Sequence, residues 1–275
     1  MNRLQTCLIT VLLLLFAFSH SFSQEGNDEL IKSLTSNLNA QTRSEKMVEI
    51  GKKFLDKPYL ASTLELPQEK LICRLDGFDC YTYVETLLAL TLISEYENPT
   101  LADFREMMQR VRYRNGEIKG YASRIHYFFD WTKNAEDLGL VEDLTPTLGT
   151  LKPVSINFMS THRQYYPAFK TNNTILGQIK EMESELQDFD FFEIKVENLP
   201  KVQNQIKSGD IIAFTSNIKG LDVNHEGIAY WKDGKLHFMH ASSELKKVVI
   251  ADETIEEYIR RISKHSGLMV VRIQE

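Results

Sequence analysis

Cys80 is positioned like a nucleophile at the beginning of a helix. It follows Asp79 in the stretch LDGFDCYTYVETLLAL, residues 75–90, where a turn gives way to a long apolar run. If a helix begins there, Asp79 can cap it, and the free amide groups of its first turn can stabilise negative charge on the sulfur. A thiol attacks as the thiolate, so this position favours chemistry. The alternative is a buried thiol that belongs to the core.

A predicted β-hairpin brings two histidines together. In VNHEGIAYWKDGKLHFMHASS, residues 223–243, the Asp-Gly pair at 233–234 is a favoured two-residue turn between alternating strands. That register puts His225 and His240 on one face as diagonal neighbours whose rings can meet. Gly227 lies opposite His240 and leaves room beside it. Two converging histidines indicate a site more strongly than either histidine alone.

Cys80, His225 and His240 together fit nucleophilic catalysis. In that order they could act as the nucleophile, the general base, and the group that fixes the orientation and tautomer of the base. Backbone amides at the helix start could also hold an oxyanion. The same three side chains are acceptable zinc ligands, but spacings such as C-x-x-C or H-E-x-x-H are absent from the sequence. We therefore expect no metal and no cofactor.

The first 23 residues are expected to be a cleaved signal peptide. Arg3 provides a positive start, residues 7–18 are apolar, and small residues precede Gln24. The apolar run is shorter than the roughly 20 residues that span a bilayer, so a permanent membrane anchor is the less favoured alternative. The exported chain, residues 24–275, keeps only Cys73 and Cys80, too few for a disulfide scaffold. At least one free thiol is expected.

The composition is that of an ordinary globular protein with an acidic balance. Charged residues make up 25% of the 275, the formal net charge is −6, and no block of lysine or arginine occurs. Nucleic-acid binding would call for a basic face, which this sequence does not provide.

The elements that must position these residues fall into two halves. Apolar residues at helical spacing predict helices within residues 27–38, 42–55, 81–93, 100–112, 123–131, 158–169 and 174–186. Short β-rich segments separated by turn residues then predict strands within residues 191–196, 209–216, 225–231, 235–242, 246–252 and 267–273. Helices followed by strands indicate an α+β fold.

The combined motifs resemble a known group of enzymes. The pattern KPYLAST…GFDCYTYVE…KSGDIIAF…VNHEGIAY…FMHAS resembles the NlpC-type cell-wall hydrolases, which are papain-like cysteine enzymes. More narrowly, GYASRIHYFFDW, INFMSTH and GLDVNHEGIA resemble the bacterial N-acetylmuramoyl-L-alanine amidase-like family, once known only as a domain of unknown function. The resemblance covers residues 59–273. It implies a single papain-like α+β domain with the nucleophile at a helix start, a C-terminal antiparallel sheet, and a helical insertion at about 97–190.

The resemblance assigns roles residue by residue. Cys80 matches the family's nucleophile, His225 its general base, and His240 the residue that orients the base. Tyr59 matches the active-site tyrosine of the Pro-Tyr loop, an oxyanion donor or substrate contact. Asp79 matches the acidic residue that faces a substrate amine in related enzymes.

Other positions are expected to shape the contact with substrate. Most relatives carry Ser-Gly after the nucleophile, where this chain has Tyr81 and Thr82, so Tyr81 is expected to contribute to a different specificity. Arg124, with His126 nearby, is the expected contact for a sugar or a carboxylate. A salt bridge at the surface or in the core is the alternative for Arg124.

The implied activity is hydrolysis of the bond between (anhydro-)N-acetylmuramic acid and L-alanine. Two alternatives stay open: a γ-D-glutamyl-diamino acid endopeptidase with the same machinery, and a wall-binding module without catalysis. Peptidoglycan fragments are the expected partners, with no nucleic acid. The protein is expected to act as a monomer, and a role in wall recycling places it in the bacterial periplasm.

Overall fold

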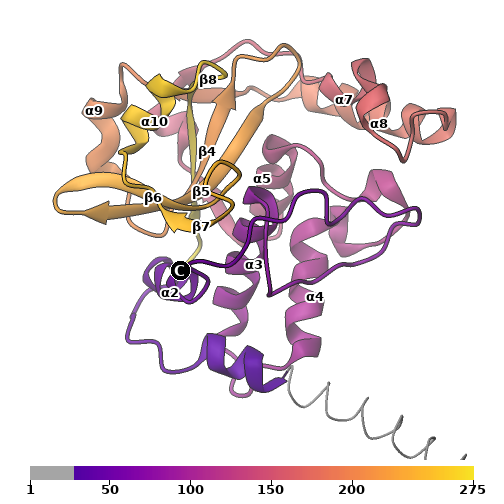
Figure 1. The fold of residues 1–275 in the computed structure, drawn as a ribbon. Helices are drawn as coiled ribbons and strands as arrows, with labels where there is room; N and C mark the ends of the chain where they lie inside the picture. Colours follow the sequence, from indigo (N-terminus) through magenta and orange to yellow (C-terminus); the bar gives the residue numbers. More distant parts are fainter. Residues whose placement is uncertain (1–27) are drawn as a thin grey trace, which may run out of the picture.

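An antiparallel sheet, contributed mostly by the C-terminal half of the chain, organises this computed structural model, which describes residues 28–275 (Figure 1). Hydrogen-bonded neighbours follow the order β2-β3-β8-β4-β5-β6-β7, and β1 pairs with β8. The strands are β1 (Val141–Asp143), β2 (Thr150–Leu151), β3 (Phe192–Lys195), β4 (Ile211–Ser216), β5 (Val223–Lys232), β6 (Lys235–Ser242), β7 (Lys247–Ile250) and β8 (His265–Ile273).

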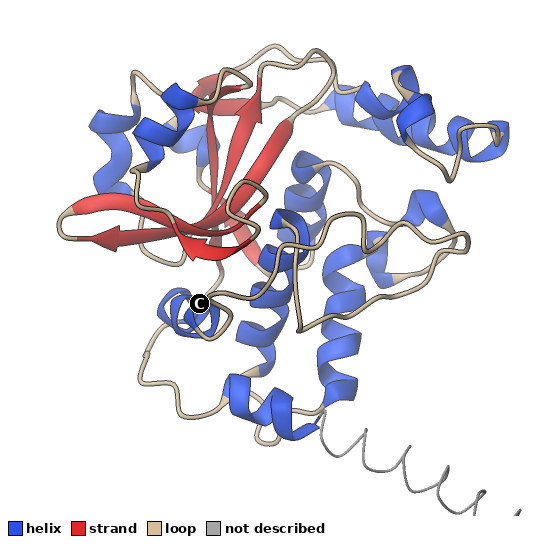
Figure 2. Cartoon of the chain, viewed as in Figure 1, coloured by secondary structure: helices blue, strands red, loops and turns tan. Residues whose placement is uncertain are grey.

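Helices lie on either side of the sheet (Figure 2). Residues 28–35 are helical. The α-helices that follow are α2 (Arg43–Lys52), α3 (Cys80–Ile93), α4 (Leu101–Arg112), α5 (Phe128–Asp137), α6 (Thr145–Leu148), α7 (Phe158–Thr161), α8 (Asn173–Glu185), α9 (Leu199–Val202) and α10 (Ile255–Arg261).

The central helix is α3, which is buried along its whole length after the first turn. Its residues from Thr82 to Ile93 are buried, and it packs against α2, α4, β5 and β6. The sequence CYTYVETLLALTLI is apolar nearly all round, which suits a helix with protein on every side. Burial of this surface fixes the place of the residues at its beginning.

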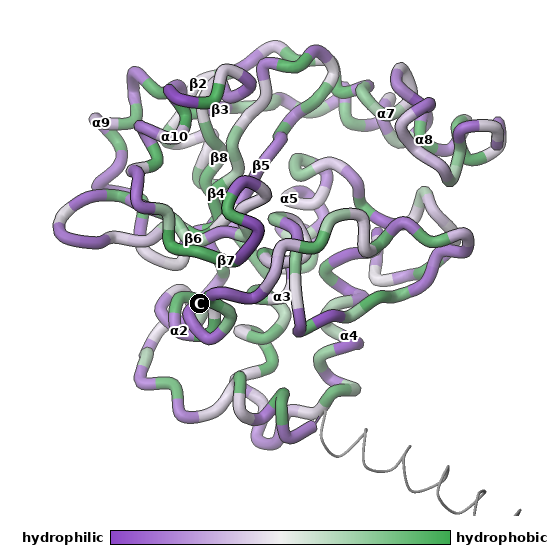
Figure 3. The backbone as a smooth tube through the Cα atoms, in the orientation of Figure 1, coloured by the Kyte–Doolittle hydropathy of each residue, from purple (hydrophilic) through white to green (hydrophobic). Residues whose placement is uncertain are grey.

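The two faces of the sheet bury separate sets of side chains. Ile228 and Met239 point into the core shared with α3, whereas Ala229 and Phe238 point into a second core under α9 and α10. Successive strand residues face opposite sides, so His225 lies on the face of Ala229. In Figure 3, β8 is largely hydrophobic, and the tip of the β5–β6 hairpin is hydrophilic.

The fold class predicted from the sequence is confirmed, with helices first and most of the antiparallel sheet afterwards. The predicted hairpin register is also confirmed. Ile228 pairs with Met239 and Lys232 pairs with Lys235, around the turn at residues 233–234.

Two predicted helices are wrong in their extent. The helix expected at 123–131 begins only at Phe128, after a short 3-10 turn, η2 (Tyr121–Ser123), and continues to Asp137. The helix expected at 158–169 is reduced to α7 and the 3-10 turn η3 (Arg163–Tyr165). Pro167 restricts the residue before it to extended backbone, which prevents a continuous helix there.

The segment 97–190 contains helices α4 to α8 and also strands β1 and β2, which join the sheet. Its description as an insertion stays a prediction. The predicted signal peptide, residues 1–23, lies outside the described residues. Among residues 28–275, no helix has the length and apolar character needed to cross a membrane.

Candidate active site

A capping box holds the first turn of α3. Oδ1 of Asp79 accepts a hydrogen bond from the Thr82 amide at 2.8 Å, and Oγ1 of Thr82 accepts one from the Asp79 amide at 3.0 Å. Cys80 is therefore the first helical residue, as the sequence predicted. Thr82 completes the cap.

The hairpin of β5 and β6 brings His225 and His240 into direct contact. Nε2 of His225 and Nδ1 of His240 are hydrogen-bonded at 2.6 Å, with the ring planes at 84°. Gly227 permits this approach, because a Cβ there would lie 2.5 Å from the carbonyl oxygen of Met239 and 3.1 Å from Cβ of His240. The two rings meet as the predicted register requires.

The sulfur of Cys80 lies against the start of β5. The backbone amides of Glu226 and Tyr81 lie close enough to act on its charge, and α3 packs against β5 (Figure 1). Glu226 directly follows His225, so the thiol lies near the strand segment that carries the imidazole. Nε2 of His225 is bonded to His240, which leaves Nδ1 as the nitrogen that can take the thiol proton.

Burial decides the protonation state of the thiol. Desolvation raises the pKa of Cys80 above its ordinary value, and the charges of Glu226 and Asp79 raise it further. The amides of Glu226, in β5, and of Tyr81, in the first turn of α3, lower it. A helix terminus typically contributes about 1 kcal/mol, whereas burial can shift a pKa by several units. Burial therefore favours the protonated thiol at rest.

Both histidines are held neutral. Burial lowers the pKa of His225 well below 6.5, and the charges of His240 and His265 lower it further. Burial and the charge of Arg261 lower the pKa of His240 to about 3. A neutral His225 can accept a proton, and its bond to His240 determines which nitrogen does so.

Tyr59 lies beside the first turn of α3 because the loop between them closes on itself. Tyr59 and Phe78 form a parallel bridge, and the Leu60 amide donates to the Phe78 carbonyl oxygen at 2.8 Å. Burial, together with the charges of Cys80 and Asp79, raises the pKa of Tyr59 to about 12. Its hydroxyl therefore stays protonated and able to donate a hydrogen bond.

Tyr81 connects the first turn of α3 to the segment that carries Arg124 and His126. Its hydroxyl donates to the carbonyl oxygen of Ile125 at 3.1 Å. Burial raises the pKa of Tyr81 well above 10. Its role in specificity stays a prediction.

Arg124 forms an ion-pair cluster with the loop that precedes α3. Its guanidinium lies 2.8 Å from Glu65 and 3.3 Å from Glu69, and 4.9 Å from the centre of the Tyr121 ring. Tyr113 donates to Glu69 at 2.7 Å. Arg124 is only 6% exposed. The structure thus shows the salt bridge that the sequence left open as an alternative, and a contact with substrate stays a prediction.

His126 belongs to the same cluster. Its ring stacks on Tyr121 with centroids 4.5 Å apart, and its Nε2 lies 2.9 Å from the Tyr121 carbonyl oxygen. Burial and the charge of Arg124 lower the pKa of His126 well below 6.5. The structure therefore places His126 beside Arg124, and its contact with substrate also stays a prediction.

Sequence reasoning missed two side chains that adjoin the catalytic candidates. Tyr258 of α10 lies against both His225 and His240, with ring centroids 5.7 and 5.8 Å away. Glu226 is buried, and burial together with Glu85 raises its pKa well above 4.5. Strand alternation could have indicated that Glu226 faces α3, but no local signal marks Tyr258, which comes from a distant helix.

The described residues contain no group of three or more His, Cys, Asp or Glu side chains arranged to hold a metal ion. Nε2 of His225 and Nδ1 of His240 form a hydrogen bond with each other, so these two nitrogens do not point toward a shared metal position. The geometry of the zinc alternative is therefore not present. Cys73 and Cys80 are both free thiols.

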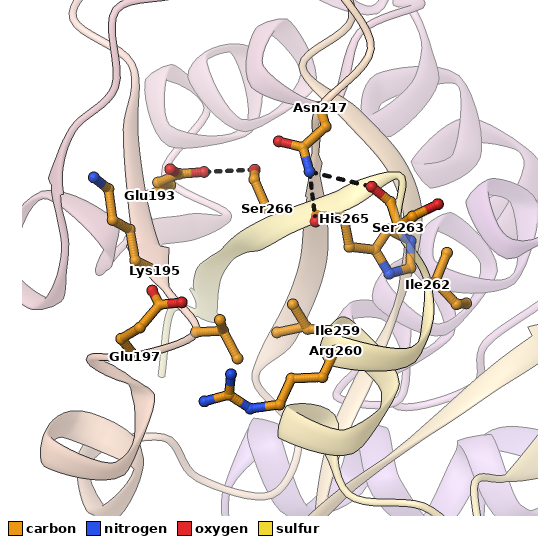
Figure 4. Close-up of a pocket in the computed structure, with 11 residues that line it drawn as sticks. Glu193, Lys195, Glu197, Asn217, Ile259, Arg260, Ile262, Ser263, His265 and Ser266 are labelled. Atoms are coloured by element: carbon orange, nitrogen blue, oxygen red, sulfur yellow. Dashed lines mark hydrogen bonds between the residues drawn. The ribbon is translucent and has the colours of Figure 1, made fainter.

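The pocket in Figure 4 is separate from the catalytic candidates. It has a volume of about 530 Å³, lies between β3, the start of β8 and the end of α10, and is lined by none of the three predicted catalytic residues. Its polar groups bond to one another. Ser266 donates to Glu193 at 2.8 Å, and the Asn217 side chain donates to the His265 carbonyl oxygen at 2.8 Å.

The fold and the site define an α+β protein with a cysteine at the start of a central helix and a hydrogen-bonded histidine pair on a hairpin of an antiparallel sheet. The chain belongs to the N-acetylmuramoyl-L-alanine amidase-like family, whose sequence model matches residues 49–267. The matched range includes Tyr59, Cys80, His225 and His240. The family resemblance read from the motifs is confirmed, and placement in the wider NlpC-type superfamily stays a prediction.

Solved structures agree with this fold. The chain is 36% identical to an N-acetylmuramoyl-L-alanine amidase from Bacteroides uniformis, with a TM-score of 0.81 over 85% of this chain and 99% of that one. It is 38% identical to a Bacteroides fragilis protein named as a candidate xylanase, with a TM-score of 0.77 over 81% and 98%. A Legionella pneumophila protein, 22% identical with a TM-score of 0.69 over 94% and 97%, shares the fold. No curated protein matches the chain.

Proposed function

We propose that the protein is a cysteine amidase that hydrolyses the bond between the lactyl group of (anhydro-)N-acetylmuramic acid and L-alanine in peptidoglycan fragments. The observation that carries the proposal is the hydrogen-bonded pair of His225 and His240 beside Cys80 in a member of the amidase-like family. Amide hydrolysis needs a nucleophile and a base whose orientation is fixed, and these three residues provide both.

The resting protonation states suggest how the first step proceeds. Cys80 attacks the amide carbonyl carbon while Nδ1 of His225 takes the thiol proton, because both groups start neutral. The amides of the first turn of α3 and the Tyr59 hydroxyl are the available donors for the oxyanion.

The second half of the reaction uses the same proton. His225 returns it to the nitrogen of L-alanine, the C–N bond breaks, and the lactyl carbonyl remains on Cys80 as a thioester. Water, deprotonated by His225, then hydrolyses the thioester and frees the lactyl carboxylate and the thiol. Throughout, His240 holds Nε2 of His225 and keeps Nδ1 toward the sulfur.

The apolar N-terminal segment suggests the setting. We propose that the protein is exported to the periplasm through residues 1–23, meets peptidoglycan fragments there and acts as a monomer. A fusion of residues 1–23 to a reporter that is active only after export would show export. A cytoplasmic reporter would contradict this placement.

Mass analysis of a muropeptide digest tests the proposed bond. An anhydro-muropeptide incubated with the protein should yield the free sugar with its lactyl carboxylate and an intact stem peptide. A shortened stem peptide would identify the γ-D-glutamyl-diamino acid endopeptidase instead. No product from any muropeptide would favour the non-catalytic wall-binding module.

A further inference from the structure

Tyr258 lies at the centre of an aromatic cluster that includes both proposed catalytic histidines. Its ring centroid is 5.7 Å from that of His225 and 5.8 Å from that of His240. Phe214 and Phe238 each lie 4.8 Å away. Tyr258 is 8% exposed, so its ring covers the histidine pair on the side of α10.

A half-exposed guanidinium lies over the outer surface of the Tyr258 ring. Arg261 lies 5.4 Å from the ring centre, and its ion pairs with Glu253 at 2.5 Å and Glu244 at 3.3 Å hold it there. The residues that help to line a pocket of about 310 Å³ are Tyr258, Arg261, Glu253, Glu244 and His240. Tyr258 and His240 are adjoining parts of the pocket wall, so removal of the ring would extend the pocket toward His225.

We propose that Tyr258 is a positioning residue whose ring excludes water from the His225–His240 hydrogen bond and holds both imidazoles in the orientation that general-base catalysis requires. The kinetic part of this inference rests on the proposed function, and the effect on the histidines rests on the geometry alone. Water at the bond would offer each imidazole a second partner and a second orientation. With water excluded, Nδ1 of His240, 2.6 Å away, is the hydrogen-bond partner of Nε2 of His225.

The charged and titratable groups around Tyr258 and the histidine pair come from three elements. They are His265 at the start of β8, 5.1 Å from the Tyr258 ring, Arg261 on α10, and Cys80 at the start of α3. The charges of His265 and Arg261 lower the pKa values of the pair, in addition to burial. All three groups remain in a variant that lacks only the Tyr258 ring. A change in imidazole titration in such a variant therefore reports the entry of water.

The test compares Tyr258→Leu and Tyr258→Met with Tyr258→Phe. The two imidazoles are titrated by NMR, with resonances assigned from His225→Gln and His240→Gln. Leu and Met remove the ring, so at least one imidazole pKa should rise toward 6.5, with kcat lowered about tenfold or more and KM changed much less. Phe keeps the ring and should keep both pKa values low. Arg260→Gln, an exposed neighbour on α10, is the control and should alter neither titration nor kcat.

Two results would overturn the proposal. One is an unchanged imidazole titration in a folded Leu or Met variant, and the other is a Phe variant that titrates as the Leu variant does. If neither the Leu nor the Met variant folds, titration of the wild-type imidazoles decides. An ordinary pKa near 6.5 for both histidines would overturn the inference, and depressed pKa values would support it. The titration needs no substrate. A failed amidase assay with the expected titration would therefore count against the proposed function and leave the positioning of the histidines supported.

Discussion

At the scale of single residues, burial shifts the pKa values of the two partners of the proposed proton transfer in opposite directions. It raises the pKa of the Cys80 thiol and lowers the pKa of the His225 imidazole, so both are neutral at rest. A thiolate–imidazolium ion pair formed before substrate binds would require the pKa of the thiol to lie below the pKa of the imidazole. In the proposed mechanism the proton therefore moves during attack on the carbonyl, and the arrangement of His225, His240 and Tyr258 matters more than a preformed thiolate.

The pH dependence of kcat/KM should show this directly. His225 must be neutral to accept a proton, and its pKa lies well below 6.5, so activity should persist as the pH falls through 6.5 and decline only at lower pH. The measurement is kcat/KM on an anhydro-muropeptide from about pH 4 to pH 8. An acid limb at or above pH 6.5 would contradict a buried, neutral base.

Glu226 should make the free energy of unfolding depend on pH, at pH values above the pKa that its carboxyl has in the unfolded chain. Its pKa in the folded protein lies well above 4.5, so the folded state retains a proton that the unfolded state loses. The stability contributed by this group then decreases as the pH rises above about 4.5, by about 1.4 kcal/mol per pH unit for as long as the pH stays below the folded pKa.

Glu226→Gln removes that dependence. Relative to wild type, the variant should become more stable in urea unfolding at pH 8 than at pH 5, with the exposed Glu106→Gln as the matched control. An equal stability difference at both pH values would show that Glu226 ionises normally in the folded protein.

At the scale of elements, α3 and the loop before it act together. The capping box of Asp79 and Thr82 fixes where α3 begins, and the bridge between Tyr59 and Phe78 closes the loop of residues 60–77. Arg124 then anchors this loop through ion pairs with Glu65 and Glu69. The result is a tyrosine and a cysteine that are distant along the chain but adjacent at the site.

Two substitutions can separate the effect of the capping hydrogen bond of Asp79 from the effect of its charge. Asp79→Ala should cost about 1 kcal/mol in urea unfolding because the Thr82 amide loses its acceptor. Asp79→Asn keeps an acceptor and should lose clearly less. Both variants remove the charge that raises the thiol pKa, so both should alkylate faster with iodoacetamide near neutral pH. Equal stability of Ala and Asn would contradict the capping role.

Arg124→Met distinguishes an ion pair that anchors the loop from a substrate contact. Removal of one partner from a largely buried cluster should cost about 3 kcal/mol and increase proteolytic cleavage within residues 60–77. Exposed Arg105→Met, on α4, is the control. A variant with wild-type unfolding and proteolysis but a raised KM would instead support the substrate contact predicted from the sequence.

At the scale of the whole molecule, the site forms where the helical half meets the sheet. Features with local signals could be predicted from the sequence: the Asp-Gly turn set the register that joins His225 to His240, and Asp79 marked the start of α3. Features that depend on distant contacts could not. Tyr258 comes from a helix after β7, and the Arg124 cluster joins segments that share no motif. The effect of burial on the Cys80 pKa likewise requires the packed structure.

The most direct test of the cysteine amidase is the turnover of one anhydro-muropeptide by wild type and by Cys80→Ser, with and without a chelator, followed by product mass. We expect free sugar and intact stem peptide from wild type, with or without the chelator, and at least about a thousandfold slower release by the serine variant. Comparable turnover by Cys80→Ser, or wild-type activity abolished by the chelator, would contradict it.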